Sequence, residues 1–134
     1  MNNSLSNIKK QLLQYGNAQK KQESYFRLKS EFDFVKQNSS KYVSKNLIIL
    51  RAEPEKGVLK IGIICGRKFC RKAVVRNRVR RIIKEAFRLL WNNIKPTKML
   101  LIPRQGAEFL KTQDIQSELI SALKKMDLWK REQE

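Results

Sequence analysis

The chain has 134 residues, 41% of them hydrophobic, which is enough for one domain with a modest core. It carries 30 Lys and Arg against 12 Asp and Glu, with no His, and so has a formal net charge of +18. Such a charge favours a nucleic acid as partner over a membrane surface or a small acidic substrate. Because the commonest general base is missing, the chain alone is a poor candidate for an enzyme.

Membrane and metal-binding functions find no support in the sequence. No apolar run approaches the ~20 residues that span a bilayer, and the first fifteen residues lack the apolar core of a signal peptide. We therefore expect a cytoplasmic protein. Cys65 and Cys70 have no His near them, and no acidic pair lies in an apolar setting, so we expect no metal or other cofactor on the protein alone.

The first part of the chain divides into an extension and the start of a domain. Residues 1–24 are rich in Asn, Gln, Ser and Lys and are expected to form a mobile extension, followed by a domain at 25–129 and a tail at 130–134. Ser30, with Asp33 three residues on, has the pattern of a helix cap and predicts a short helix to about Gln37. A short extended piece is expected at Tyr42 and Val43.

Two strands are predicted next, at 47–51 and 58–65. A turn containing Pro and Gly separates them, and they are expected to pair as an antiparallel hairpin. Gly62 falls on the face opposite Ile61 and Ile63, where the missing side chain leaves room for another backbone or a ligand. An unbroken apolar strand is predicted at 99–102, suited to the middle of a sheet, and a last helix begins at about Thr112, which can cap it.

Between these strands lies a basic amphipathic helix, predicted from about Ala73 to about Asn93. At about 100° per residue, one face collects the apolar residues Val75, Val79, Ile82, Ile83, Ala86 and Leu90. The stretch from Arg71 to Arg88 holds eight basic residues and a single acid, Glu85. Like charges at that density repel, so the polar face predicts a polyphosphate partner. The order helix, strands, helix, strand, helix predicts a two-layer α/β sandwich.

The basic helix and the loop before it resemble the "RNR" signature of the bacterial ribonuclease P protein subunit. The motif is Arg76-Asn77-Arg78 within 71–88. The resemblance extends over about 27–126 and includes Arg27-Leu28, 31–35, Ile61-Gly62-Ile63, Arg67-Lys68 and the apolar strand before Pro103. It implies an αβββαβα order with a left-handed βαβ crossover, as in domain 2 of ribosomal protein S5.

The resemblance also implies a function. In this family a small basic protein assembles with a catalytic RNA, RNase P RNA, and holds the 5′ leader of precursor tRNA while the leader is removed by endonucleolytic cleavage. The RNA carries the chemistry with bound Mg²⁺. The high like charge of this chain further suggests a monomer in the absence of RNA.

Two sets of site residues follow by position from the resemblance. The RNA-binding set comprises Arg67, Lys68, Arg71, Lys72, Arg76, Asn77, Arg78, Arg80, Arg81, Lys84 and Arg88. A leader-binding cleft between the first helix and the sheet would use Phe32, Phe34, Val35, Ile48 and Leu50. Which of the two Phe side chains faces the cleft stays open.

Other functions are compatible with parts of the pattern. A ribosomal or other structural RNA-binding protein would use the same basic helix without any role in cleavage. A DNA-binding regulator is less favoured because no helix-turn-helix pair precedes the helix, and a self-sufficient nuclease lacks catalytic groups. Replacing Arg78 or Arg81 by Ala is expected to weaken RNA binding with little loss of stability.

Overall fold

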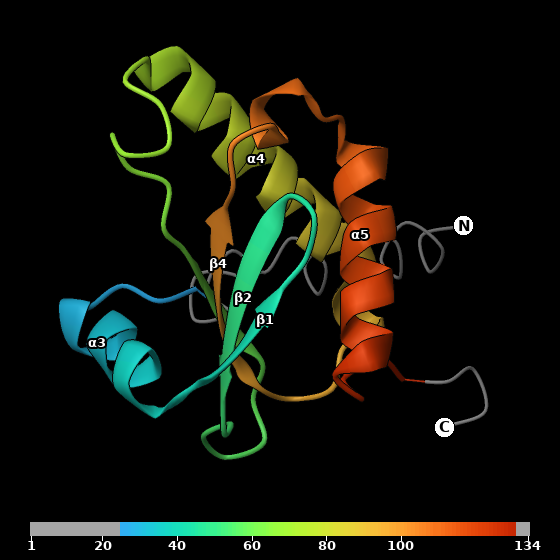
Figure 1. Cartoon of the computed structure of the whole chain (residues 1–134). Coiled ribbons are helices and arrows are strands. Elements are labelled where there is room, and N and C mark those ends of the chain that lie inside the picture. The colour runs from blue at the N-terminus through green and yellow to red at the C-terminus, as the bar shows by residue number, and fades with distance from the viewer. Residues whose placement is uncertain (1–24, 131–134) are drawn as a thin grey trace, which may run out of the picture.

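The structure, a computed structural model, describes residues 25–130, so the predictions for 1–24 and 131–134 lie outside the described residues. Its elements are α3 (Lys29–Asn38), β1 (Ser40–Val43), β2 (Leu47–Ala52), β3 (Lys60–Ile63), α4 (Ala73–Leu90), β4 (Lys98–Pro103) and α5 (Thr112–Lys125). Two 3-10 turns, η1 (Trp91–Asn93) and η2 (Ala107–Phe109), follow α4 and β4. This order confirms the predicted αβββαβα arrangement (Figure 1).

The four strands form one sheet in the order β1-β2-β4-β3. β2 is antiparallel to β1 and to β4, whereas β3 is parallel to β4 and joined to it through α4. The predicted hairpin between 47–51 and 58–65 is therefore wrong, because β4 lies between these strands. The reason is the apolar run of β4: Met99, Leu100 and Leu101 are all fully buried, which requires a neighbour on each side and cover on both faces.

Helices cover both faces of the sheet. α4 and α5 pack on one face over the main core, where Ile49 and Leu101 of the sheet meet Ile83 and Leu119 of the helices. On the opposite side of the sheet, α3 covers a smaller cluster of Phe26, Val35, Ala52 and Leu100 (Figure 1). The two-layer sandwich thus gains a partial third layer from α3.

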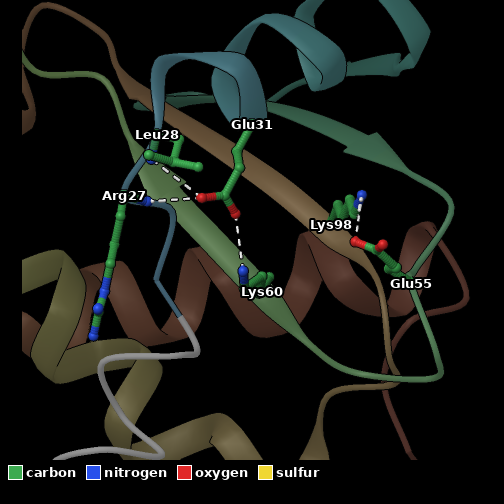
Figure 2. A network of polar contacts seen from close by, with 6 residues as sticks. All are labelled: Arg27, Leu28, Glu31, Glu55, Lys60 and Lys98. Atoms are coloured by element: carbon green, nitrogen blue, oxygen red, sulfur yellow. Dashed lines mark hydrogen bonds and ion pairs between the residues drawn. The ribbon is translucent and has the colours of Figure 1, made fainter.

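The third residue of α3 and of α5 is an acid whose carboxylate accepts hydrogen bonds from backbone N–H groups at the start of the helix. The predicted cap at Ser30 is wrong: the N-cap is Leu28, two residues earlier, and Glu31 Oε1 accepts hydrogen bonds from the backbone N–H groups of Arg27 and Leu28, both at 3.1 Å (Figure 2). Thr112 is likewise not the cap of α5, since the residue before it, Lys111, donates its N–H to Asp114 Oδ2 at 2.9 Å. In both cases the acid satisfies N–H groups that would otherwise lack acceptors.

The amphipathic pattern of α4 is confirmed. Val79, Ile83, Ala86 and Leu90 are buried, and Val75 and Ile82 are half-buried at the edge of the core. Phe87, absent from the predicted stripe, is also fully buried. The apolar face of α4 is therefore committed to folding, and its polar face remains for other contacts.

Candidate nucleic-acid interface

Most of the predicted RNA-binding residues lie exposed on α4 and on the loop before it. We call this set the basic surface; its members are Arg67, Lys68, Arg71, Lys72, Asn77, Arg81, Lys84 and Arg88. The polar side of α4 has no acid in its first turn, and Glu85 pairs with Arg88 at 2.6 Å. Lys84 Nζ lies 5.4 Å from the centre of the Tyr25 ring. The surface therefore presents cations with little compensating negative charge.

The remaining three arginines of the signature, Arg76, Arg78 and Arg80, are partly buried and anchored to backbone carbonyls. Arg76 Nη1 donates to the carbonyls of Cys70 and Arg71 at 2.9 and 2.8 Å. Arg80 Nη2 donates to the carbonyl of Cys65, two residues after the end of β3. These two side chains hold the ends of the loop that carries Arg67 and Lys68.

Arg78 holds a different segment, the turn after β4. Its Nη1 and Nη2 atoms donate to the carbonyls of Glu108 and Leu110 at 2.8 and 3.0 Å. Hydrogen bonds from a charged donor are worth more than neutral ones, so their loss is felt in stability. The expectation that Arg78→Ala leaves stability nearly unchanged is therefore revised, whereas the exposed Arg81 keeps it.

On the other side of the sheet, Phe32 is a packing residue. Its ring meets that of Phe26 edge-on, with centroids 5.4 Å apart and planes at 81°. Both rings occupy the space beside Gly62, where an added Cβ would lie 2.6 Å from Phe26 Cδ2 and 2.8 Å from Phe32 Cε1. The room predicted at Gly62 thus holds two aromatic side chains of this chain, and Phe32 is committed to the core.

Phe34 is the one of the two Phe residues that faces outward, and the residue is 45% exposed. Lys98 Nζ lies 4.4 Å from the centre of its ring and 3.4 Å from Glu55 (Figure 2 shows the Lys98–Glu55 pair). Val35, on the side of α3 that packs against the sheet, is fully buried, so the prediction that it offers a surface to a ligand is wrong. Adjacent residues of a helix point in different directions, so Val35 lies on the side of α3 that packs against the sheet and Phe34 does not.

Ile48 and Leu50 are half-buried on the α3 side of the sheet, as predicted. Sequence reasoning missed two neighbours: Val43, which is half-exposed, and Ile102, both of which lie directly opposite Ile48 in the strand register. Only the pairing identifies them, since the sequence does not show which strands flank β2. We call Phe34, Val43, Ile48, Leu50 and Ile102 the apolar sheet surface.

An ion pair between Glu31 and Lys60 links α3 to the sheet. Its Oε2 atom accepts a hydrogen bond from Lys60 Nζ of β3 at 2.9 Å (Figure 2). Burial by itself would raise the pKa of Glu31, but the hydrogen bonds from Lys60 and from the N–H groups of Arg27 and Leu28, together with the Lys60 charge, outweigh it and hold the pKa below its ordinary value. Burial, and then the charge of Glu85, raises the pKa of Tyr25.

Within residues 25–130, no group of three or more Cys, Asp or Glu side chains is placed to hold a metal ion. No helix of that part of the chain is long and apolar enough to cross a membrane. Cys65 is buried, Cys70 is partly exposed, and both are free thiols.

Comparison with known proteins identifies the fold and the family together. The family model described as ribonuclease P matches residues 20–127. The chain belongs to the ribonuclease P protein family. The ribonuclease P protein component of Clostridium botulinum (strain Langeland) is 31% identical over 109 residues, which cover 80% of this chain and 97% of that protein. That of Pseudoalteromonas atlantica is 31% identical over 102 residues, covering 76% and 80%.

Solved structures of the family share the architecture described above. A Staphylococcus aureus RNase P protein mutant superimposes with a TM-score of 0.75 at 21% identity, covering 86% of this chain and 98% of that one. The RNase P protein of Thermotoga maritima gives 0.68 at 24% identity, covering 75% and 96%. As a ribonuclease P protein component, the chain acts in tRNA processing within a ribonucleoprotein endoribonuclease, with RNase P RNA as its partner.

Proposed function

We propose that this chain binds the catalytic RNA through the basic surface and the 5′ leader of precursor tRNA through the apolar sheet surface. The observation that carries the proposal is the density of exposed cations on α4 and the preceding loop, where the acid Glu85 is paired with Arg88. Lys and Arg side chains that neutralise RNA phosphates release the counterions condensed on the RNA, which gives affinity without sequence preference. The planar guanidinium of Arg81 suits bidentate contacts to phosphate oxygens.

In this proposal the two surfaces bind by different physics. The apolar sheet surface offers the exposed Phe34 ring and half-buried aliphatic side chains. Every base has a flat π-face, so stacking on such a surface tolerates any leader sequence. Lys98, beside the Phe34 ring, is paired with Glu55, so binding at this surface would depend on stacking and burial and little on charge.

The chemistry itself is assigned to the RNA. The chain has no His, and we propose that the RNA subunit would hold the Mg²⁺ that cleavage requires. The protein then acts by supporting the RNA fold and holding the leader in place. Repulsion at a net charge of +18 favours a monomer until RNA neutralises it, and we place the assembly in the cytoplasm.

The test measures 5′-leader cleavage of precursor tRNA by the folded RNase P RNA of the same genome at low Mg²⁺, with and without the protein. We expect the protein to raise the cleavage rate, and a double variant with Lys72→Glu and Arg81→Glu to raise it far less. A matched double variant outside the basic surface, Lys124→Glu and Lys125→Glu near the C-terminal end of α5, has the same net charge as the first and should retain stimulation.

Two outcomes would contradict the proposal. RNA binding without stimulation of cleavage would favour a structural RNA-binding protein. Equal loss in the α4 and α5 double variants would show that overall charge, and not the basic surface, carries the effect. Leader binding is tested separately by comparing precursors with a long leader and with a single leader nucleotide, because only the former can reach the apolar sheet surface.

A further inference from the structure

An aromatic side chain outside the predicted site stands almost entirely in solvent. Phe109, the last residue of η2, is 82% exposed, the largest exposed fraction among the large hydrophobic residues that the structure describes. At this exposure the ring contributes little to the core, so it is available to contact a partner.

The backbone that carries Phe109 is held on both sides, although the ring itself is not. Arg78 donates to the carbonyls of Glu108 and Leu110, the two chain neighbours of Phe109. The Phe109 N–H donates to the Gly106 carbonyl at 3.2 Å, and the Glu108 carboxylate accepts from the Gly106 N–H at 3.0 Å. A ring on a turn fixed in this way is presented at low entropic cost to a partner.

The turn also belongs spatially to the basic surface. Figure 1 shows the segment after β4 lying against α4, and Arg78, which holds it, is one helical turn from Arg81. Gln105 Nε2 donates to the Phe69 carbonyl at 2.8 Å, which ties the same segment to the loop of Arg67 and Lys68. Lys111, two residues beyond the ring, is exposed as well. An aromatic ring among cations suits a partner with both phosphates and flat apolar faces.

We propose that Phe109 stacks on an unpaired base of RNase P RNA, so that the RNA interface extends from α4 onto η2. This inference rests on the proposed function, because it assumes that RNA lies on the basic surface. Arg78 then has two effects: it contributes positive charge, and it fixes the turn that presents the ring. A protein partner is less favoured, since the cations around the ring would need acidic complements.

The test compares the affinity of Phe109→Ala, Phe109→Leu and Phe109→Tyr variants of the full chain for folded RNase P RNA at several salt concentrations. Stacking on an aromatic ring predicts roughly a tenfold loss for Phe109→Ala, a smaller loss for Phe109→Leu and near-normal affinity for Phe109→Tyr. The salt dependence should stay parallel to wild type, because no cation is removed. Val58→Ala, a half-exposed apolar residue on the turn before β3, is the matched control and should change nothing.

A second readout is direct. A Phe109→Trp variant should lose fluorescence when RNA saturates the protein, beyond the change that Trp91 and Trp129 show in the wild-type chain. If Phe109→Ala binds RNA as tightly as the wild type while Arg81→Ala binds it more weakly, the stacking proposal is overturned and the proposed function stands. No RNA binding by the wild type overturns both. Self-association that Phe109→Ala abolishes, with RNA affinity unchanged, would assign the ring to a second copy and also overturn the stacking proposal.

Discussion

The basic surface and the apolar sheet surface expose opposite kinds of group. On α4 and its loop, exposed cations repel one another and are hardly compensated by acids. On the α3 side of the sheet, apolar side chains are half-exposed, and the nearby cations Lys60 and Lys98 each have an acidic partner, Glu31 and Glu55. Each surface is unfavourable alone for a different reason, so a ligand relieves repulsion at one and apolar exposure at the other.

The two surfaces should differ in how strongly their binding affinity depends on salt concentration. Binding to the basic surface should weaken steeply with ionic strength, because phosphate contacts release counterions. Binding to the apolar sheet surface should depend on salt far less, because stacking and burial involve no counterions. The variants below either remove the frame that both surfaces share or alter one surface at a time.

The largest effect is expected from Val79→Asp. Val79 is buried on the apolar face of α4, and an unpaired carboxylate there costs several kcal/mol, a large part of the stability of a small domain. Circular dichroism should show mostly unfolded protein at 25 °C. A cooperatively folded Val79→Asp protein would mean that the faces of α4 are assigned the wrong way round, and with them the basic surface.

The next effect distinguishes the two Phe residues of α3. Phe32→Ala removes a ring packed against Phe26 and Gly62 and should lower the free energy of unfolding by about 2 kcal/mol. Phe34→Ala should cost less than about 1 kcal/mol, yet reduce affinity for long-leader precursor about fivefold or more without changing the salt dependence. Urea unfolding and binding at two salt concentrations measure both. Leader affinity lost only in Phe32→Ala would contradict the assignment of Phe34 to the leader.

Sequence patterns predicted the parts of this fold that depend on local periodicity. The apolar stripe of α4 could be predicted because residues at helical spacing face the same core. Strand pairing was not found, because the partner of β2 is decided by the burial of β4, which lies about 50 residues away. The apolar run of β4 indicated a central strand, and it could have excluded a simple hairpin of 47–51 with 58–65.

In the candidate site, too, features that depend on nearby residues could be predicted and features that depend on distant residues could not. A surplus of cations on one helix is visible in the sequence, so the basic surface could be predicted. Which arginines turn toward the protein could not, because the acceptors of Arg78 are backbone carbonyls 30 and 32 positions away. Val35 was misassigned for a related reason: its burial depends on the sheet beneath α3. Gly62 carried a usable signal, since a glycine inside a strand indicates close approach of another group, here the two Phe rings.

Two arginines one helical turn apart on α4, Arg81 of the basic surface and the partly buried Arg78, sharpen the comparison. Arg81→Ala should leave stability within about 0.5 kcal/mol of wild type, weaken RNA binding several-fold and lower the salt slope by about 1. Arg78→Ala should also weaken binding, but in addition lower the free energy of unfolding by about 1 kcal/mol, because the carbonyls of Glu108 and Leu110 lose a charged donor. Equal stability of the two variants would show that the Arg78 contacts contribute nothing to the fold.

The smallest effect is expected for Glu31, which pairs with Lys60 on the α3 side of the sheet. The folded-state pKa of Glu31 lies below its ordinary value, so its ionised form stabilises the fold above the unfolded-state pKa, and this contribution is lost as the pH falls through the folded-state pKa. Glu31→Gln should therefore lower stability at neutral pH, by less than about 1 kcal/mol for a partly exposed ion pair, and the deficit should shrink in acid. Urea unfolding at pH 7 and near pH 3, with the exposed Glu53→Gln as control, measures the difference. A loss of stability of the same size at both pH values would mean that the Glu31 side chain stabilises α3 without its charge. The ion pair with Lys60 would then contribute no free energy, and the contrast with the unpaired cations of α4 would not be an energetic one.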